Sequence, residues 1–156
     1  MSGPAEEKQK NVIRLSVRAL VAFSIFPPDI MPMSFSLMEE GRKAHMSRQE
    51  ISGAKREQGL KFQGSRQGVD FYISGRMDLY DPDITPPLIE EIKLSGGEAP
   101  QEARREHLYQ ALCYGYMLCL RDEISVVTIR VSYATIQGEL VAAFDEVYSF
   151  KALEEA

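Results

Sequence analysis

The sequence predicts an α/β fold in which a mixed sheet of about five strands is flanked by helices. Three segments repeat apolar residues at helical spacing, whereas five others alternate or are rich in β-branched and aromatic residues. The predicted order is two helices, three strands, one helix and two strands. A length of 156 residues suits one domain. We therefore expect a single domain over residues 12–156, preceded by a polar, disordered tail at 1–11.

The first two predicted elements are helices. Residues 12–26 place apolar side chains on one helical face, and Pro27-Pro28 then ends the helix. Ser36 to Glu39 has the form of a capping box and predicts the start of a second helix. This helix is expected to end near Glu50, with His45 on one face.

Three strands are predicted next, at 54–66, 69–80 and 88–94, and a proline-rich turn separates the last two. A hairpin centred between Ile84 and Thr85 places Asp78 opposite Glu91 and Arg76 opposite Lys93. Directly opposite residues in such a hairpin have Cβ atoms about 5 Å apart.

Two carboxylates at this separation repel each other unless a cation or a shared proton lies between them. Lys93 lies two residues after Glu91 and therefore points to the same face. The arrangement offers two hard oxygen ligands for Mg²⁺ or Mn²⁺, with an ammonium group beside them. The alternative is an exposed strand pair whose charge is balanced by Arg76 and Lys93. Glu90 points to the other face and is predicted to be a strand-end or interface residue.

The C-terminal third predicts one long helix and two strands. Pro100 suits the first turn of a helix that ends near Leu120, and His107 is expected to be a solvated position on it. Residues 124–136 and 140–150 follow as strands. Residues 151–156 read as the beginning of another helix, which suggests a domain of a longer protein.

Composition points to a cytoplasmic protein. The sequence has no apolar run of membrane-spanning length and no apolar signal core at the N-terminus. Cys113 and Cys119, the two cysteines, are six residues apart in the predicted long helix and cannot reach each other as a disulfide. We therefore expect reduced thiols. Two cysteines are also too few for an iron–sulfur cluster, so none is expected.

The charge is unevenly distributed. The net charge is −5, yet residues 42–66 hold seven basic and two acidic side chains, whereas residues 67–98 hold two basic and seven acidic ones. A basic strip beside an acidic pocket suits a protein that binds phosphates next to a metal site. A solvated charged face is the alternative.

Three motifs together resemble a known family. Asp78, a turn, and then Glu91-x-Lys93 resemble the catalytic core of the PD-(D/E)XK nuclease superfamily, although the proline before the aspartate is absent. Glu40 to His45 resembles the helix that brings a histidine ligand in RecB-type nucleases, and Gln110 to Tyr114 resembles the QxxxY helix of that branch. The resemblance covers residues 12–150. The sequence is similar to the RecB-type domains found ahead of helicases and to CRISPR adaptation exonucleases.

The resemblance implies a restriction-endonuclease-like fold and assigns roles. His45, Asp78, Glu91 and the backbone carbonyl of Ile92 would bind Mg²⁺ or Mn²⁺, and Lys93 would act with Asp78 and Glu91 in catalysis. Gln110 and Tyr114 would position the substrate strand. Arg76 is a further candidate phosphate contact. The residues alone leave other roles open. His45 could be a core histidine, and Lys93 could form a salt bridge with Glu91. Gln110 and Tyr114 could be polar residues beside an apolar stripe of the long helix.

The expected function is therefore metal-dependent hydrolysis of phosphodiester bonds in DNA, as an exonuclease on single strands or ends in repair, recombination or defence. A helicase domain or subunit is the expected protein partner. Two alternatives stay open. One is a catalytically silent nuclease fold that binds DNA or a helicase. The other is a metal-dependent enzyme that acts on a different phosphorylated substrate.

Overall fold

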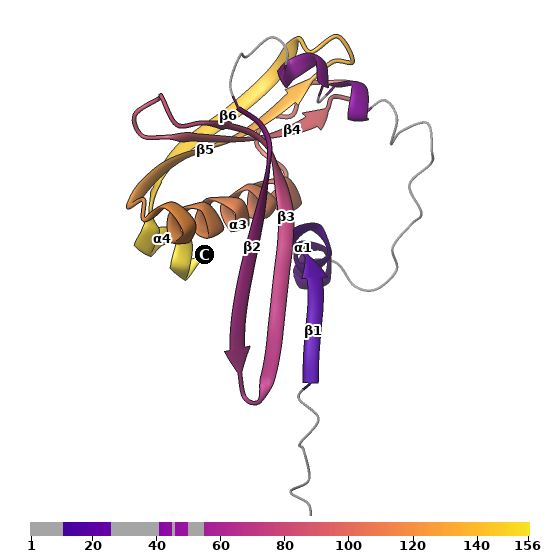
Figure 1. Ribbon diagram of the computed structural model, residues 1–156. Helices are drawn as coiled ribbons and strands as arrows, with labels where there is room; N and C mark the ends of the chain where they lie inside the picture. Colours follow the sequence, from indigo (N-terminus) through magenta and orange to yellow (C-terminus); the bar gives the residue numbers. More distant parts are fainter. Residues whose placement is uncertain (1–10, 26–40, 45, 50–54) are drawn as a thin grey trace, which may run out of the picture.

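A mixed sheet organises the fold (Figure 1). The computed structural model describes residues 11–25, 41–44, 46–49 and 55–156. Within these residues the sheet has six strands. In chain order the elements are β1 (Asn11–Ser16), α1 (Val17–Ile25), β2 (Lys55–Arg66), β3 (Val69–Asp81), β4 (Leu88–Leu94), α3 (Arg105–Asp122), β5 (Val126–Ala134), β6 (Leu140–Ser149) and α4 (Phe150–Glu155). The segments 41–44 and 46–49 are also helical.

The strand order is β1-β3-β4-β5-β6, and β2 pairs with β3 along its other side. The pairs β1–β3 and β4–β5 are parallel, whereas β2–β3, β3–β4 and β5–β6 are antiparallel. The expected α/β class, with a mixed sheet flanked by helices, is therefore confirmed. The sheet has one strand more than the sequence predicts.

The extra strand corrects the first predicted helix. Residues 11–16 are not helical but form β1, which runs parallel to the first half of β3. The helix starts only at Val17, because the Ser16 hydroxyl accepts a hydrogen bond from the Ala19 N–H at 3.0 Å and caps it. The β-branched Val12 and Ile13 suit the strand. Helical periodicity continued upstream of the cap and concealed the boundary.

The start of the long helix is also later than predicted. Residues 100–104 are not helical, and α3 begins at Arg105, where the N–H groups of His107 and Leu108 bond to the carbonyl of Arg104. The Arg104 N–H is bonded to the hydroxyl of Tyr133, which fixes this end of the helix on β5. The short C-terminal helix predicted after residue 150 is present as α4, capped by Ser149.

The main core lies between the sheet and α1, α3 and α4 (Figure 1). Its members include Ile89 of β4, Leu118 of α3, and Val127 and Ile129 of β5, all almost inaccessible to solvent. A Cβ on Gly115 would lie 2.7 Å from Ile129, so the glycine lets α3 approach the sheet closely. No helix of the described residues is long and apolar enough to cross a membrane.

The hairpin of β2 and β3 extends well beyond the rest of the molecule, and β1 lies alongside it (Figure 1). Its turn is formed by Gln67 and Gly68, which have φ values of 51° and 79°. We call the part of the hairpin between this turn and the pair Gly59–Arg76, together with β1, the arm.

Candidate active site

The site forms where β3 and β4 separate. The ladder pairs Asp81 with Leu88, Tyr80 with Ile89 and Leu79 with Glu90, which is the register predicted from the sequence. It ends there, and we call this point the fork. At the fork, Asp78 Oδ2 accepts a hydrogen bond of 2.8 Å from the Ile92 N–H. The carboxylate thus replaces the next ladder bond. The expected cross-strand pairing of Arg76 with Lys93 is not part of the ladder.

The two predicted carboxylates meet at the fork. Glu91 is 3% exposed and its side chain is within hydrogen-bonding reach of the half-buried Asp78. Burial raises the pKa of Asp78 to about 6, although the Ile92 N–H and the charge of Lys93 act in the opposite direction. Part of the Asp78 population is therefore protonated at neutral pH when no cation is bound.

Lys93 connects this pair to α3. Its Nζ lies 2.7 Å from Glu91 Oε1 and donates a hydrogen bond of 3.0 Å to Gln110 Oε1. Gln110 is 5% exposed, so a buried amide holds the ammonium group beside the carboxylates. The salt bridge between Lys93 and Glu91, an alternative left open by the sequence, is present.

Tyr114 lies one turn further along α3 and reaches the same place. A Cβ on Gly75 would lie 2.6 Å from Tyr114 Cε1, so the phenol ring packs directly on this glycine of β3. Burial, followed by the negative charges of Glu91 and Asp78, raises the pKa of the Tyr114 hydroxyl. The hydroxyl is hydrogen-bonded to the backbone of Arg76, which partly offsets this. The structure thus brings Asp78, Glu91, Lys93, Gln110 and Tyr114 into one cluster.

Sequence reasoning missed three residues around this cluster. Gln49 is buried, and its Nε2 donates a 2.5 Å hydrogen bond to the backbone carbonyl of Asp78. Arg48 Nε lies 3.1 Å from Glu90 Oε1. The exposed Arg18 of α1 lies close enough for its charge to lower the pKa values of Asp78 and Tyr114. All three are distant from the fork in sequence, so no local pattern marked them.

Glu90 is not a strand-end residue. Its side chain is 1% exposed and accepts hydrogen bonds from Arg48 and from the Ser132 hydroxyl, the latter at 2.6 Å. Because neighbouring residues of a strand point to opposite faces, Glu90 faces the helical segment 46–49 while Glu91 faces α3. The structure therefore gives the two adjacent carboxylates separate surroundings.

His107 is not the solvated residue that the sequence predicts. Its Nδ1 lies 2.9 Å from the Tyr133 hydroxyl, which accepts the Arg104 N–H and can therefore donate its proton to the ring. Burial and then the charges of Lys93 and Arg104 lower the pKa of His107 to about 3. The ring is therefore neutral at physiological pH, and it packs against Tyr133 near Lys93.

The donor set fits a hard divalent cation. Two adjacent carboxylates match the oxygen ligands that Mg²⁺ and Mn²⁺ prefer. His45, the predicted third ligand, lies outside the described residues. Ile92 is fully buried at the fork. No group of three or more His, Cys, Asp or Glu side chains suited to a metal occurs among the residues that the structure describes.

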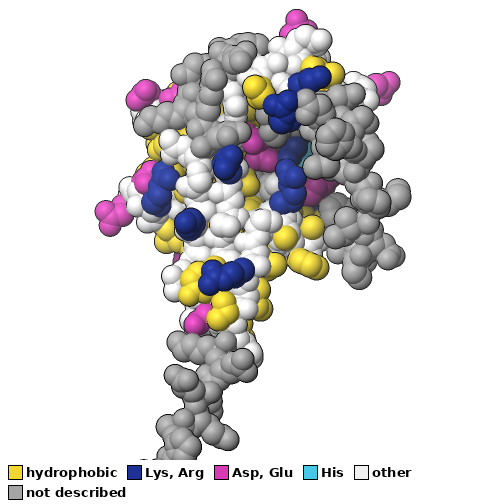
Figure 2. Space-filling view, turned by 45° about the vertical axis from the view of Figure 1, so that its right-hand side comes forward, with side chains coloured by type: hydrophobic (Ala, Val, Ile, Leu, Met, Phe, Trp, Pro, Cys, Tyr) yellow, Lys and Arg dark blue, Asp and Glu magenta, His cyan; other side chains and the backbone are white. Residues whose placement is uncertain are grey.

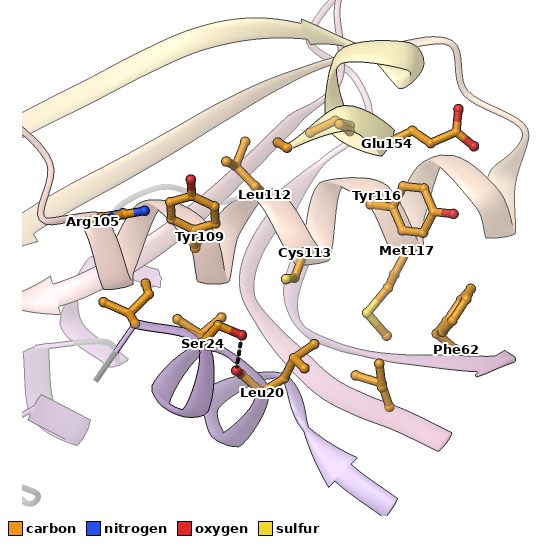
Figure 3. A pocket seen from close by; sticks show the side chains of 15 residues that line it. Leu20, Ser24, Phe62, Arg105, Tyr109, Leu112, Cys113, Tyr116, Met117 and Glu154 are labelled. Carbon is orange, nitrogen blue, oxygen red and sulfur yellow. Dashed lines mark hydrogen bonds between the residues drawn. The ribbon is translucent and has the colours of Figure 1, made fainter. Parts of the chain in front are cut away.

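A mainly apolar cavity lies elsewhere. A space of about 460 Å³ lies between α1, α3 and α4, and Leu20, Tyr109, Cys113 and Met117 are among the side chains around it (Figure 3). Its lining is mainly apolar and contains none of the clustered carboxylates. The chemistry of the fork, and not the size of this cavity, marks the candidate site.

No known protein-family profile matches the sequence, and no curated protein matches it. Among solved structures, the crystal structure of SSO0001 is similar, with a TM-score of 0.60 at 16% identity over 95% of this chain and 76% of that chain. At this identity the similarity shows a shared α/β fold alone. Rai1 of Scheffersomyces stipitis matches with a TM-score of 0.34 at 13% identity, over 92% of this chain and 55% of that chain. That score is too low to establish a common fold.

Proposed function

We propose that this protein is a metal-dependent nuclease that hydrolyses phosphodiester bonds in DNA, acting on single strands or ends. The observation that carries the proposal is the cluster at the fork. Asp78 of β3, Glu91 and Lys93 of β4, and Gln110 and Tyr114 of α3 come from three elements and converge at one place. Two carboxylates with an ammonium beside them supply what phosphate hydrolysis requires.

Each residue has a task under this proposal. Asp78 and Glu91 hold Mg²⁺ or Mn²⁺, with His45 and the Ile92 carbonyl as the further ligands that the family resemblance implies. The metal, when bound, polarises the phosphate and lowers the pKa of an attacking water. Lys93 then leaves part of its contact with Glu91 to hold the water or an oxygen of the phosphate. Its charge stabilises the negative charge that grows in the transition state.

The residues of α3 position other groups and do not take part in the reaction themselves. Gln110 accepts a hydrogen bond from Lys93 and keeps the ammonium group from turning away from the carboxylates. Tyr114 keeps its proton because its pKa is raised, so the hydroxyl remains a hydrogen-bond donor at all physiological pH values. Arg76, exposed on β3 just before Asp78, suits contact with a neighbouring phosphate.

A second candidate function is a silent module that binds DNA or a helicase. The observation in its favour is that the Lys93 ammonium contacts both Glu91 and Gln110, so it has partners without substrate. In a module without activity, Lys93 would simply remain in these contacts.

Replacement of Lys93 separates the two functions. We expect Lys93→Ala to keep Mn²⁺ binding and most DNA affinity, but to lower the single-turnover cleavage rate by about 10²–10³-fold, as loss of a transition-state contact does. Lys93→Arg should restore little, because a planar guanidinium does not replace a compact ammonium. Lys151→Ala, which removes a lysine that is 83% exposed on α4, is the matched control. A wild-type protein that binds DNA but cleaves none with Mg²⁺ or Mn²⁺ would establish the silent module instead.

A further inference from the structure

One face of the arm carries a row of exposed polar and basic side chains. The ladders show which residues share this face, because directly paired residues point the same way. Tyr72 pairs with Arg14 of β1 and with Gln63 of β2, and Ser74 pairs with Lys61. We call the surface formed by Arg14, Lys61, Gln63, Tyr72, Ser74 and Arg76 the arm face.

The arm face is positively charged. Arg14, Lys61 and Arg76 are all exposed. The described acid on the same side of these strands is Asp70, which lies beyond Tyr72 toward the turn. Figure 2 shows Lys and Arg side chains spread over one face of the molecule and around a central acidic group. A polyanion approaching the fork is therefore attracted to the arm although the whole chain is acidic.

The arm face also contains a planar stack. The Arg14 guanidinium lies 4.4 Å from the centre of the Tyr72 ring, and Gln63 donates a hydrogen bond of 3.3 Å to the Tyr72 hydroxyl. Two neighbours thus fix a half-buried aromatic side chain in place. Bases of single-stranded nucleic acids stack on tyrosine rings and on guanidinium planes. The bases of a duplex are already stacked on each other and have no free face to offer.

The spacing leads to the fork. The row Tyr72, Ser74, Arg76 runs along β3 toward the fork, and Arg76 is two residues before Asp78. Tyr72 is six residues from Asp78, a span of about 20 Å along the strand. Tyr114 packs on Gly75 from the other side of β3. An extended strand of a few nucleotides laid on the arm face would therefore reach the carboxylates where β3 and β4 separate, beyond Arg76.

We propose that the arm face is the entry track for a single-stranded nucleic acid, whose phosphates contact Arg14, Lys61 and Arg76 and one of whose bases stacks on the Arg14–Tyr72 pair. The role of the arm face, which is to lead a substrate to the fork, rests on the proposed nuclease function. Binding itself does not need the metal or the hydrolysis.

Binding is measured first, without metal. A fluorescent oligothymidylate of about 15 nucleotides, the matching oligouridylate and a duplex of the same length are titrated in EDTA at several salt concentrations. We expect Arg14→Gln and Lys61→Gln each to weaken single-strand binding several-fold and to reduce the salt slope by about 0.7 per lost phosphate contact. The control Lys151→Gln should change neither. Arg14→Lys should keep the salt slope but lose stacking affinity. Comparison of the two oligonucleotides decides between DNA and RNA.

Cleavage of a long and a short substrate then separates this proposal from the previous one. Arg14→Gln should slow cleavage of the oligonucleotide at low concentration but not that of a trinucleotide, which does not reach Arg14 from the fork. If arm variants bind every probe as Lys151→Gln does, the track is overturned, even when cleavage is observed. Equal losses on the duplex and the single strand would overturn the single-strand assignment. Weakened single-strand binding in a protein that cleaves nothing would support the track and reject the nuclease.

Discussion

Asp78 has two tasks that its two oxygens can share. One is the contact with Glu91 that suits a cation, and the other is the hydrogen bond from the Ile92 N–H. The second task is structural, because the backbone N–H of a fully buried residue otherwise has no ladder partner at the fork. Substitutions at this position therefore test chemistry and structure separately.

We predict that Asp78→Asn folds at least as stably as the wild type at neutral pH but no longer binds Mn²⁺. The amide oxygen can still accept the Ile92 N–H, whereas the metal loses a charged ligand. Asp78→Ala should be less stable than Asp78→Asn by about 1–3 kcal/mol, because the N–H is left unsatisfied. Calorimetric titration with Mn²⁺ and urea unfolding measure the two effects. The exposed Asp83→Asn is the control, and equal Mn²⁺ binding by Asp78→Asn and Asp83→Asn would reject the ligand role.

The raised pKa of Asp78 also predicts a pH dependence. The carboxyl loses its proton near 3.8 when unfolded but near 6 when folded, so the unfolded state binds fewer protons between these values. The contribution of Asp78 to stability is therefore greatest below the lower value and is lost as the pH rises to the upper one. In EDTA, Asp78→Asn should gain about 2–3 kcal/mol relative to the wild type between pH 3.5 and pH 7. Urea unfolding of both proteins across this range measures the difference, and a difference that does not vary with pH would contradict it.

The affinity for a metal ion should also depend on the protonation of Asp78, but it should rise with pH where the stability falls. A proton on Asp78 competes with the cation, so the affinity for Mn²⁺ should increase as the pH rises through about 6.

At the scale of elements, the site depends on how closely α3 approaches β3. Tyr114 reaches the fork because Gly75 has no side chain, and a Cβ there would lie 2.6 Å from the tyrosine ring and 3.0 Å from Val17 Cγ2. The glycine thus serves packing between two helices and a strand. Its backbone φ is not in the left-handed region, so a substitution acts through sterics alone.

We predict that Gly75→Ala destabilises the protein by about 1–3 kcal/mol, as overpacking does, and lowers cleavage by displacing Tyr114. Gly59→Ala is a matched control, since Gly59 pairs across the strand with Arg76 and a Cβ there would meet nothing within 4 Å. Thermal unfolding and single-turnover cleavage measure both variants. If the two substitutions have equal effects, the close approach of Tyr114 is not what positions the site.

At the scale of the whole molecule, the turn between β5 and β6 holds the helical segment 46–49 in place. Gly138 has a φ of +85°, and a Cβ there would lie 2.6 Å from the backbone of Ser47. The Ser47 hydroxyl also donates a 2.7 Å hydrogen bond to the Ile136 carbonyl. The segment carries Gln49, whose amide binds the backbone of Asp78. The turn between β5 and β6 is therefore linked to the fork through the helical segment 46–49.

We predict that Gly138→Ala weakens Mn²⁺ binding and lowers stability by more than Gly68→Ala does. Both glycines have positive φ, but only Gly138 has backbone atoms where the new methyl group would lie. The comparison removes the conformational cost that both variants share, about 1 kcal/mol. Urea unfolding and Mn²⁺ titration of the two variants provide the test. Equal metal affinities would show that the helical segment does not position the carboxylates.

Local patterns predicted what depends on local geometry. The register at Leu79 and Glu90 follows from the turn between the strands, and Gln110 and Tyr114 share a face because they are four residues apart on a helix. β1 was missed because its pairing with β3 is made with a partner more than fifty residues away in sequence. The contact of Gln49 with Asp78 and the burial of Glu90 likewise depend on packing between distant segments. Such contacts leave no periodic signal in the chain.

Because Asp78 closes the fork between β3 and β4, its presence does not by itself mark an active enzyme. A descendant of this protein that no longer hydrolysed anything would still need a hydrogen-bond acceptor for the Ile92 N–H. Aspartate or asparagine would thus persist at position 78 for stability alone. Glu91 and Lys93 bond chiefly to each other and to Gln110, and an apolar set of similar volume could replace them at little cost. Inactive descendants of this protein should therefore be recognised by what stands at positions 91 and 93, and not by the aspartate.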